Sequence, residues 1–262
     1  MDLDLSGKHA LVCGASDGIG KATAIELALL GADVTVLARR EPVLQQVVSE
    51  LPLVIEGQVH GWRVGDDGQT QALGDTVAAL ALERPVHILV NNGGGPPGGK
   101  AIEADLDAYL TAFRHHLLAN QARVQAVLPG MRAAGWGRIV NVVSTSVYEP
   151  IPNLGVSNTT RGAVAGWAKT LSRELGPDNI TVNNVLPGFT RTARMNHIVA
   201  DRMAAGGGTA EQVIETIATT VPLRRVADAS EVAAAIAFLA SPAASYITGI
   251  SLAVDGGRLQ SI

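Results

Sequence analysis

A glycine-rich loop near the N-terminus has the composition and the setting of a phosphate-binding loop. It lies directly after a short apolar run and directly before a helical pattern. Glycines allow a tight turn and a close approach of the backbone, and the start of the following helix offers unpaired N–H groups to a pyrophosphate. This context predicts a dinucleotide site, although a purely structural turn would use glycine as well. The residues expected to contact the cofactor here are Gly14, Ser16, Asp17, Gly18, Ile19 and Gly20.

Two arginines after the second apolar run bear on which cofactor binds. The run ends in Ala38, followed by Arg39 and Arg40. A site for the unphosphorylated cofactor usually places Asp or Glu here to bind the ribose hydroxyls, and Ala38 cannot do so. Guanidinium groups instead bind a 2′-phosphate through charge-assisted hydrogen bonds. We therefore expect NADP(H) in preference to NAD(H), with Arg39 and Arg40 as the contacts; two solvated arginines at a helix start are the alternative.

Both motifs fall where a parallel sheet would bring them together. Short β-branched runs alternate with helical patterns, as in right-handed βαβ units, and such sheets bind ligands beyond the carboxyl ends of their strands. The fold class predicted is α/β, a three-layer doubly wound parallel sheet of the Rossmann type with about seven strands, in a single domain over residues 1–262. Strands are expected at 9–13, 34–38, 59–64, 86–91, 139–144, 181–186 and 251–254, and helices at 19–30, 42–51, 69–82, 106–133, 157–175 and 230–239.

Further motifs make nearly the whole chain resemble the short-chain dehydrogenase/reductase family. Residues 91–94 are similar to the family's Asn-Asn-Ala-Gly element, and residues 183–188 with Thr192 resemble the Pro-Gly segment that borders the nicotinamide. Residues 222–225, 248–249 and 255–257 also match the family's pattern. The sequence is most similar in style to the 3-oxoacyl-[acyl-carrier-protein] reductases. The resemblance implies cofactor contacts from Asn91, Gly93, Arg161, Pro187, Gly188 and Thr192.

The catalytic positions depart from the family's set of Asn, Ser, Tyr and Lys. Ser144 fills the Ser position, but Ser157, Arg161 and His116 stand where Tyr, Lys and Asn are usual. The usual Tyr exchanges a proton with the substrate, and the cation one helical turn later lowers its pKa. An alcohol is a far weaker acid than a phenol, and an arginine holds its proton too tightly to relay it. The resemblance thus implies a retained cofactor site with an interrupted proton pathway.

Two other groups are candidates for the missing proton donor. Tyr148 lies four residues after Ser144, in the loop that leaves the fifth expected strand. His116 titrates near neutral pH, but His115 beside it weakens its case, since only one of two adjacent helical side chains faces a cleft. A pocket-wall tyrosine and a packed histidine are the alternative interpretations. Ser144, at a strand end, is expected to hydrogen-bond a substrate oxygen.

Composition excludes several other classes of protein. The 262 residues carry 20 Lys+Arg against 24 Asp+Glu, a net charge of −4, so no basic surface for nucleic acid is expected. With 47% hydrophobic and 17% charged residues, the chain is too apolar to be disordered. The single cysteine, Cys13, rules out a disulfide scaffold and indicates a reducing compartment. The acidic N-terminus, the absence of long apolar stretches and the scattered histidines predict a cytoplasmic protein without membrane span or metal site.

Residues 190–221 are expected to cover the substrate. Gly206-Gly207-Gly208 looks like a hinge, and the resemblance makes this region a substrate lid. Small residues within 162–168 allow close helix packing, and the resemblance implies a homotetramer or homodimer there; packing on the chain's own sheet explains them equally well. Seven apolar side chains either line a pocket beneath the lid or form the buried face of an amphipathic helix: Met195, Ile198, Val199, Met203, Val213, Ile214 and Ile217.

These observations predict an NADP(H)-dependent oxidoreductase that acts on a carbonyl or alcohol, a small molecule or a 3-oxoacyl thioester. Ser144 would orient the substrate oxygen, Arg161 would hold the ribose and supply positive charge, and Tyr148 or Ser157 would exchange the proton. Two alternatives keep the fold and the nucleotide. One is a nucleotide-binding sensor or non-catalytic partner subunit, and the other is a lyase or isomerase that acts without net oxidation of the cofactor.

Overall fold

Seven parallel strands form one sheet in the computed structural model, which describes residues 1–261. Their spatial order is β3-β2-β1-β4-β5-β6-β7. The order reverses between β1 and β4, where Val12 pairs with Val36 of β2 on one side and with Val90 of β4 on the other. The doubly wound sheet predicted from the sequence is confirmed, and its switch point is the place where such folds bind ligands. The strands are β1 (His9–Cys13), β2 (Asp33–Ala38), β3 (Gly61–Val64), β4 (Ile88–Asn91), β5 (Gly137–Val142), β6 (Ile180–Pro187) and β7 (Ser251–Val254).

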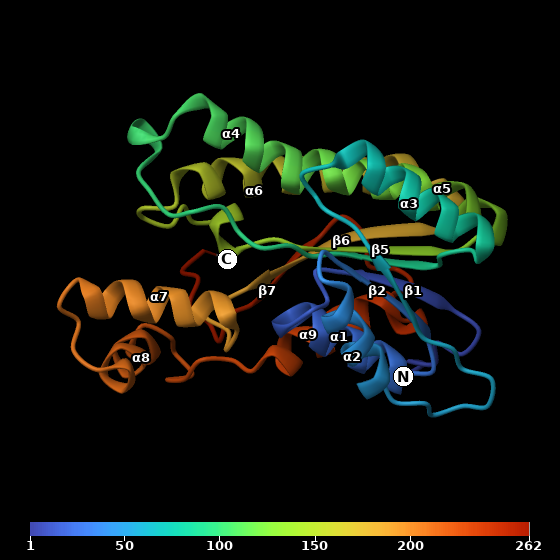
Figure 1. The fold of residues 1–262 in the computed structure, drawn as a ribbon, viewed down its shortest axis with the longest axis horizontal. Coiled ribbons are helices and arrows are strands. Elements are labelled where there is room, and N and C mark those ends of the chain that lie inside the picture. Colours follow the sequence, from blue (N-terminus) through green and yellow to red (C-terminus); the bar gives the residue numbers. More distant parts are fainter. Residues whose placement is uncertain (262) are drawn as a thin grey trace.

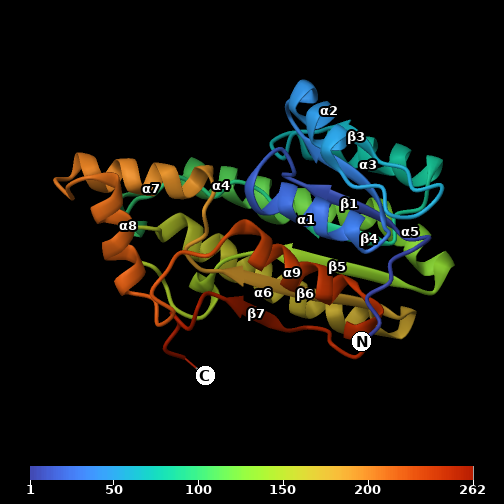
Figure 2. The same cartoon turned by 90° about the horizontal axis from the view of Figure 1, so that it is seen from below.

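Helices cover both faces of the sheet (Figures 1 and 2). Because successive strand residues point to opposite faces, Val12 and Val36 pack in one apolar cluster while Leu11 and Leu37 pack in the other. Both faces are therefore buried, as the β-branched, continuously apolar strands require. One layer contains α1 (Gly18–Leu29), α2 (Glu41–Glu50) and α9 (Ala229–Ala240); the other contains α3 (Thr70–Glu83), α4 (Leu106–Phe113), α5 (Ala119–Ala134) and α6 (Gly155–Leu175).

One expected helix is interrupted. The sequence predicts a single helix over 106–133, but α4 ends at Phe113 and a π-helical turn, η2 (Arg114–Leu118), separates it from α5. The apolar residues of this segment keep a regular helical spacing over its whole length, so the sequence does not reveal such a turn. π-helical turns are frequent at functional sites, and this one carries both His115 and His116. The other predicted boundaries lie within two residues of the observed ones.

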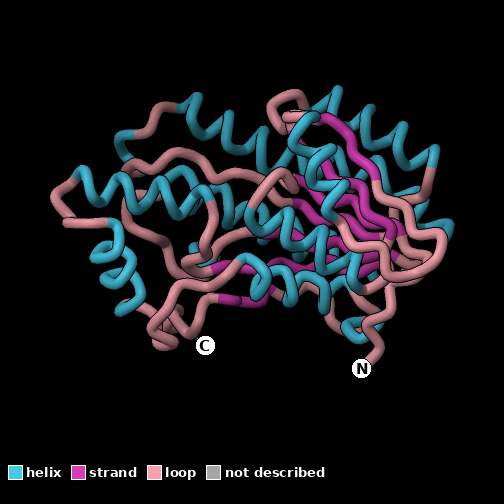
Figure 3. Tube along the Cα trace, turned by 60° about the horizontal axis from the view of Figure 1, so that its bottom comes forward, coloured by secondary structure: helices cyan, strands magenta, loops and turns pink. Residues whose placement is uncertain are grey.

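The segment expected to act as a lid forms two helices, α7 (Ala193–Ala204) and α8 (Ala210–Thr219). They lie beyond one end of the sheet, apart from the two helical layers (Figures 1 and 3). Val199, Val213 and Ile217 pack with Met195 in a small apolar cluster between them, so the amphipathic alternative holds for these side chains. Of the seven apolar residues considered for a pocket, Met195 and Ile198 line the cleft described below.

No helix within residues 1–261 combines the length and the apolarity that a membrane span needs. Over the same residues, no cluster of three or more His, Cys, Asp or Glu side chains is arranged to hold a metal ion.

Candidate functional site

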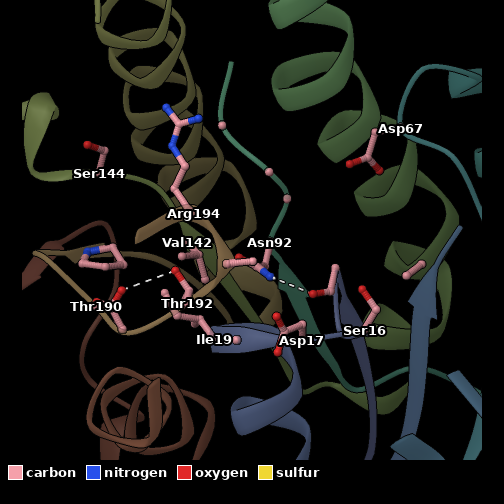
Figure 4. A pocket seen from close by; sticks show the side chains of 18 of the residues that line it. Ser16, Asp17, Ile19, Asp67, Asn92, Val142, Ser144, Thr190, Thr192 and Arg194 are labelled. Atoms are coloured by element: carbon pink, nitrogen blue, oxygen red, sulfur yellow. Dashed lines mark hydrogen bonds between the residues drawn. The ribbon is translucent and has the colours of Figure 1, made fainter. Parts of the chain in front are cut away.

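A cleft of about 670 Å³ opens beyond the carboxyl ends of the central strands. Its lining falls into two groups. What we call the nucleotide end comprises residues 14–19, 37–40 and 65–67, from the loops after β1, β2 and β3. What we call the reacting end comprises residues 142–144, Ser157, Arg161, residues 187–190 and 192–195, and Ile198, from β5, α6 and the segment that enters α7. The loop after β4, residues 92–95, lies between them; Figure 4 shows side chains from both ends.

Main-chain geometry determines the shape of the nucleotide end. Gly14 and Gly18 adopt the left-handed conformation, with φ of +58° and +54°. A Cβ atom on Gly20 would lie 2.3 Å from the carbonyl oxygen of Gly14, and one on Gly14 would lie 2.6 Å from that of Asn92. Only glycine fits these positions. The loop therefore brings the first turn of α1 to the cleft, where its N–H groups are available to an anion.

Asn92 holds this loop and was not singled out from the sequence. Its side-chain Nδ2 donates hydrogen bonds to the carbonyl oxygens of Cys13 (3.3 Å) and Gly14 (3.2 Å). Figure 4 shows the amide directed toward the loop that bears Ser16 and Asp17. Its position in the sequence could have identified it, because Asn92 is the first residue after β4 and so lies at the edge of the sheet where the loops converge.

Asn91 has a different role from the one expected for it. It does not line the cleft; its Nδ2 donates to Oδ1 of Asn141 (2.9 Å). The chain of amides continues from Asn141 to Asn184 (3.0 Å) and from Asn184 to Oγ of Ser251 (3.0 Å). These residues are in register across four adjacent strands. Asn91 therefore begins a buried ladder that ties β4 to β7 beneath the cleft, in place of contacting a cofactor.

The end of β2 presents the two arginines that were expected to select the cofactor. Arg39 and Arg40 both line the cleft just beyond Ala38. Within the described chain neither arginine forms a salt bridge, so both guanidinium groups are available to a phosphate. Asp67 also lines this end, and its carboxylate is held by the buried Arg123 of α5.

Ser144, Ser157 and Arg161 meet at the reacting end. Oγ of Ser144 accepts a hydrogen bond from the main-chain N–H of Ser146 (3.1 Å), which leaves its own proton free to donate. Ser157 and Arg161 lie one turn apart on α6, both buried and both lining the cleft. One guanidinium nitrogen, Nη1 of Arg161, donates to the carbonyl oxygen of Val142 at the end of β5 (3.1 Å).

The charge of Arg161 is poorly compensated by the protein. Its side chain is 8% exposed, and its buried Nε has no hydrogen-bond partner. Burial, together with the charge of Arg194, lowers the pKa of Arg161 to about 10, so it remains cationic at neutral pH. An unpartnered buried donor costs free energy unless a ligand accepts from it. Arg161 thus fits the cofactor ribose that the resemblance assigns to it, and the glycine loop and Arg39 and Arg40 fit the phosphates.

The structure does not bring Tyr148 or His116 to the cleft. The Tyr148 hydroxyl donates to the carbonyl oxygen of Ser251 (2.9 Å), and the side chain is half exposed outside the lining. His116 is buried; that burial and the nearby Arg161 charge lower its pKa to about 3, so its ring is neutral at neutral pH. His115 lines the cleft instead. Neither of the two substitute proton donors considered from the sequence is placed to serve the reacting end directly.

Comparison with known proteins identifies the family. Residues 14–258 match the family model described as enoyl-(acyl carrier protein) reductase. The chain is 32% identical to the 3-oxoacyl-[acyl-carrier-protein] reductase FabG of Pseudomonas aeruginosa, an alignment that covers 99% of this chain and 100% of that protein. It is 31% identical to the NADPH-dependent reductase BacG of Bacillus subtilis, over 98% of this chain and 100% of the relative.

Solved structures agree. L-sorbose reductase from Gluconobacter frateurii, in complex with NADPH and L-sorbose, superimposes with a TM-score of 0.93 at 29% identity, covering 100% of both chains. An NADPH-dependent reductase involved in bacilysin biosynthesis, YwfH, gives a TM-score of 0.92 at 29% identity over 98% of this chain and 100% of that one. From the family-model match over residues 14–258, the glycine loop at the switch point and these relatives, we conclude that the chain belongs to the short-chain dehydrogenase/reductase family of NAD(P)-dependent oxidoreductases.

Proposed function

We propose that this protein is an NADP(H)-dependent oxidoreductase that interconverts a carbonyl and an alcohol without the usual Tyr and Lys. The observation that carries the proposal is the cleft itself. Its nucleotide end keeps the family's main-chain architecture, while its reacting end brings Ser144, Ser157 and Arg161 together around an open volume.

Arg39 and Arg40 support the preference for the phosphorylated cofactor. Neither has a carboxylate partner in the described residues, and Ala38 offers no acceptor to ribose hydroxyls. Two relatives described above also use NADPH by their names or titles. When bound, the nicotinamide supplies or accepts the hydride. The protein's part is to orient the substrate oxygen, to stabilise its charge and to deliver or remove a proton.

Ser144 and Arg161 would act on the substrate oxygen as charge develops there. The Ser144 oxygen accepts from Ser146, and within residues 1–261 its hydroxyl donates to no protein acceptor, so its proton is available to a substrate. Donors placed in advance around a developing alkoxide, in a site with little water, are among the largest contributions to catalysis. Arg161 adds a positive charge that persists at neutral pH, since its pKa lies near 10 despite burial.

The proton would reach the substrate through Ser157 and water. Ser157 occupies the spacing of the usual Tyr and lines the cleft, whereas Tyr148 and His116 do not. An alcohol cannot lose its proton at neutral pH, so Ser157 must pass a proton on while it receives another. The rate of proton transfer through Ser157 therefore depends on access of water to the cleft. A tyrosine would not need that water, because it carries its own ionisable proton.

The test is turnover. Oxidation of NADPH and of NADH would be followed with a panel of aliphatic, cyclic and aromatic ketones and 3-oxoacyl thioesters, with the reverse reaction on the matching alcohols. We expect turnover with at least one pair and a preference for NADPH. No turnover of either cofactor across the panel, by protein that binds NADPH, would refute the oxidoreductase.

A nucleotide-binding sensor is a second candidate, favoured by the absence of tyrosine from the cleft lining. The double variant Ser157→Tyr with Arg161→Lys separates the two functions. If it creates activity that the natural protein lacks, the sensor gains support. If it destroys activity that the natural protein has, the unusual residues are the catalytic ones. The thermal midpoint and the NADPH affinity of the variant establish that it is folded and binds.

We also propose that the protein self-associates through α4, η2 and α6. Leu110 and Leu118 are large apolar residues that are 62% and 50% exposed. Gly162 and Gly166 lie on α6 with open space where a side chain would be, which permits close approach of a second helix. Sedimentation would show a homodimer or homotetramer, and Leu110→Lys would shift it toward the monomer.

A further inference from the structure

The reacting end of the cleft contains a second cation for which the family's reaction provides no partner. Arg194, in the first turn of α7, lines the cleft and was not singled out from the sequence. Nη2 of Arg194 donates to the carbonyl oxygen of Pro96 (3.3 Å), in the loop after β4. Figure 4 shows its guanidinium extended away from Ser16 and Asp17. Its charge contributes to lowering the pKa of Arg161, so the two cations lie close enough to repel each other.

Within the described part of the chain, no carboxylate balances this pair. Among residues 1–261 neither Arg161 nor Arg194 takes part in a salt bridge. The acids that line the cleft are Asp17, Asp66 and Asp67, all at the nucleotide end, and Asp67 is already paired with Arg123. Bringing two like charges together, one of them buried, is unfavourable unless an anion joins them.

The cofactor would not supply that anion at this place. Its 2′-phosphate fits Arg39 and Arg40, and its pyrophosphate fits the glycine loop and the first turn of α1. Thr192 packs against this loop, but the Arg194 guanidinium extends away from it (Figure 4). The ribose offers only neutral hydroxyls to Arg161. Apolar side chains also line this end, namely Leu154, Phe189, Met195 and Ile198, together with the hydroxyls of Thr190 and Thr192. This combination of a hydrophobic wall with a charged donor suits an organic acid better than a sugar or a simple ketone.

We infer, on the basis of the proposed oxidoreductase function, that the substrate is a carboxylate-bearing carbonyl compound whose carboxylate is bound by Arg194, with Arg161 adding positive charge beside it. Guanidinium groups bind carboxylates in a bidentate manner that lysine cannot reproduce. The oxygen to be reduced then lies at Ser144, and the carboxylate lies on the side of the cleft formed by α7. The inference assigns a specificity role to the first turn of α7, which sequence reasoning described only as part of a lid.

The experiment compares acids with their neutral esters. Oxo acids whose carbonyl is two, three or four carbons from the carboxylate (acetoacetate, 4-oxopentanoate and 5-oxohexanoate) are tested against their methyl esters with saturating NADPH. We expect at least one acid to exceed its ester by roughly 10- to 100-fold in kcat/KM, the effect of one charge-assisted interaction. Arg194→Gln should abolish most of that ratio, and Arg194→Lys should restore part of it.

Two controls locate the effect. Arg202→Gln removes a cation from the same helix, outside the cleft lining, and should leave the ratio unchanged. The dissociation constant of NADPH should change less than about twofold in Arg194→Gln, because a single non-contacting charge has little effect on a bound ligand. If Arg194→Gln weakens NADPH binding as much as it weakens use of the acids, Arg194 serves the cofactor and the inference is wrong.

A binding measurement separates this inference from the proposed function. Calorimetric titration of the NADP⁺-loaded protein with each acid and each ester needs no turnover. If no compound is reduced but an acid binds in an Arg194-dependent way, the oxidoreductase proposal fails and the anion site stands. If ketones are reduced but acids and esters bind equally well, the oxidoreductase stands and the anion site fails.

Discussion

The two ends of the cleft are held in shape by different parts of the chain. At the nucleotide end the main chain makes the site: Gly14, Gly18 and Gly20 pass so close to their neighbours that a Cβ atom would collide. At the reacting end the site consists of side chains such as Ser144 and Arg161, brought by elements far apart in the sequence. A main-chain site cannot change its residues without losing its shape. A site made of side chains can have its residues replaced, and its chemistry changed, while the fold stays the same.

The largest effect is expected where one side chain is replaced and nothing else moves. Ser144→Ala removes a hydroxyl whose proton has no acceptor among residues 1–261, and kcat should fall by roughly 10²- to 10³-fold, as when one oxyanion donor is removed. NADPH affinity and the thermal midpoint should be unchanged. Thr159→Ala on α6 removes an exposed hydroxyl bonded only to the Gly155 carbonyl and serves as the control. A loss below threefold would show that Ser144 does not touch the substrate.

At the nucleotide end we expect a substitution to weaken NADPH binding and to lower the thermal midpoint, the two properties that Ser144→Ala should leave unchanged. Gly20→Ala places a Cβ atom 2.3 Å from the Gly14 carbonyl oxygen, so the loop must shift, at a cost of about 1–3 kcal/mol. NADPH affinity should drop by up to about 100-fold together with a lower thermal midpoint. Gly74→Ala in α3 meets only Ala122 at an ordinary 3.5 Å and should stabilise the protein slightly, by about 0.5–1 kcal/mol. Full NADPH affinity in Gly20→Ala would mean that the loop is not the phosphate site.

Side chains determine one property of the nucleotide end, which is the choice between NADPH and NADH. The double variant Arg39→Ser with Arg40→Ser should raise the KM for NADPH by roughly 10- to 30-fold and leave that for NADH within about twofold, since only the phosphorylated cofactor has the charge to lose. Arg173→Ser, which removes an exposed cation from α6, is the control. Equal losses with both cofactors would show that the arginines support the loop and do not read the phosphate.

The same contrast explains what could be predicted from the sequence. The strand and helix boundaries, the glycine loop and the doubly wound sheet of about seven strands follow from local patterns, and the structure adds the strand order. Asn91 and Asn92 show the limit. Adjacent identical residues differ in role because β4 ends between them, and a boundary error of one residue exchanges a sheet-tying amide for a loop-holding one.

The reacting end was less predictable because its side chains meet only through the fold. The spacing of Ser157 and Arg161 on one helix was readable, and both line the cleft. Tyr148 is close to Ser144 in the chain, yet its hydroxyl bonds to Ser251, a residue on β7 that no local pattern links to it. Arg194 was missed for the same reason: its proximity to Arg161 arises from where α7 packs against the loop after β4.

The smallest predicted effect tests whether His116, buried outside the cleft lining, stays neutral in the folded protein. Burial of His116 on η2, followed by the charge of Arg161, lowers the pKa of its ring to about 3, below the 6.5 of an unfolded chain. Between these values the unfolded chain binds a proton that the folded protein does not, so stability is complete above pH 6.5 and falls as the pH drops. At pH 5.5 the loss from this residue amounts to about 1.4 kcal/mol.

His116→Asn has no proton to gain, so its unfolding free energy should fall less than that of the natural protein between pH 7 and 5.5, by about 1.2 kcal/mol. His9, at the start of β1, has its pKa lowered to about 4 mainly by burial, and it contributes equally to the pH dependence of stability in both proteins. His197→Asn, on the exposed side of α7, should keep the natural slope. Parallel curves for natural protein and His116→Asn would mean that His116 is protonated in the fold, which would return it to consideration as the proton donor.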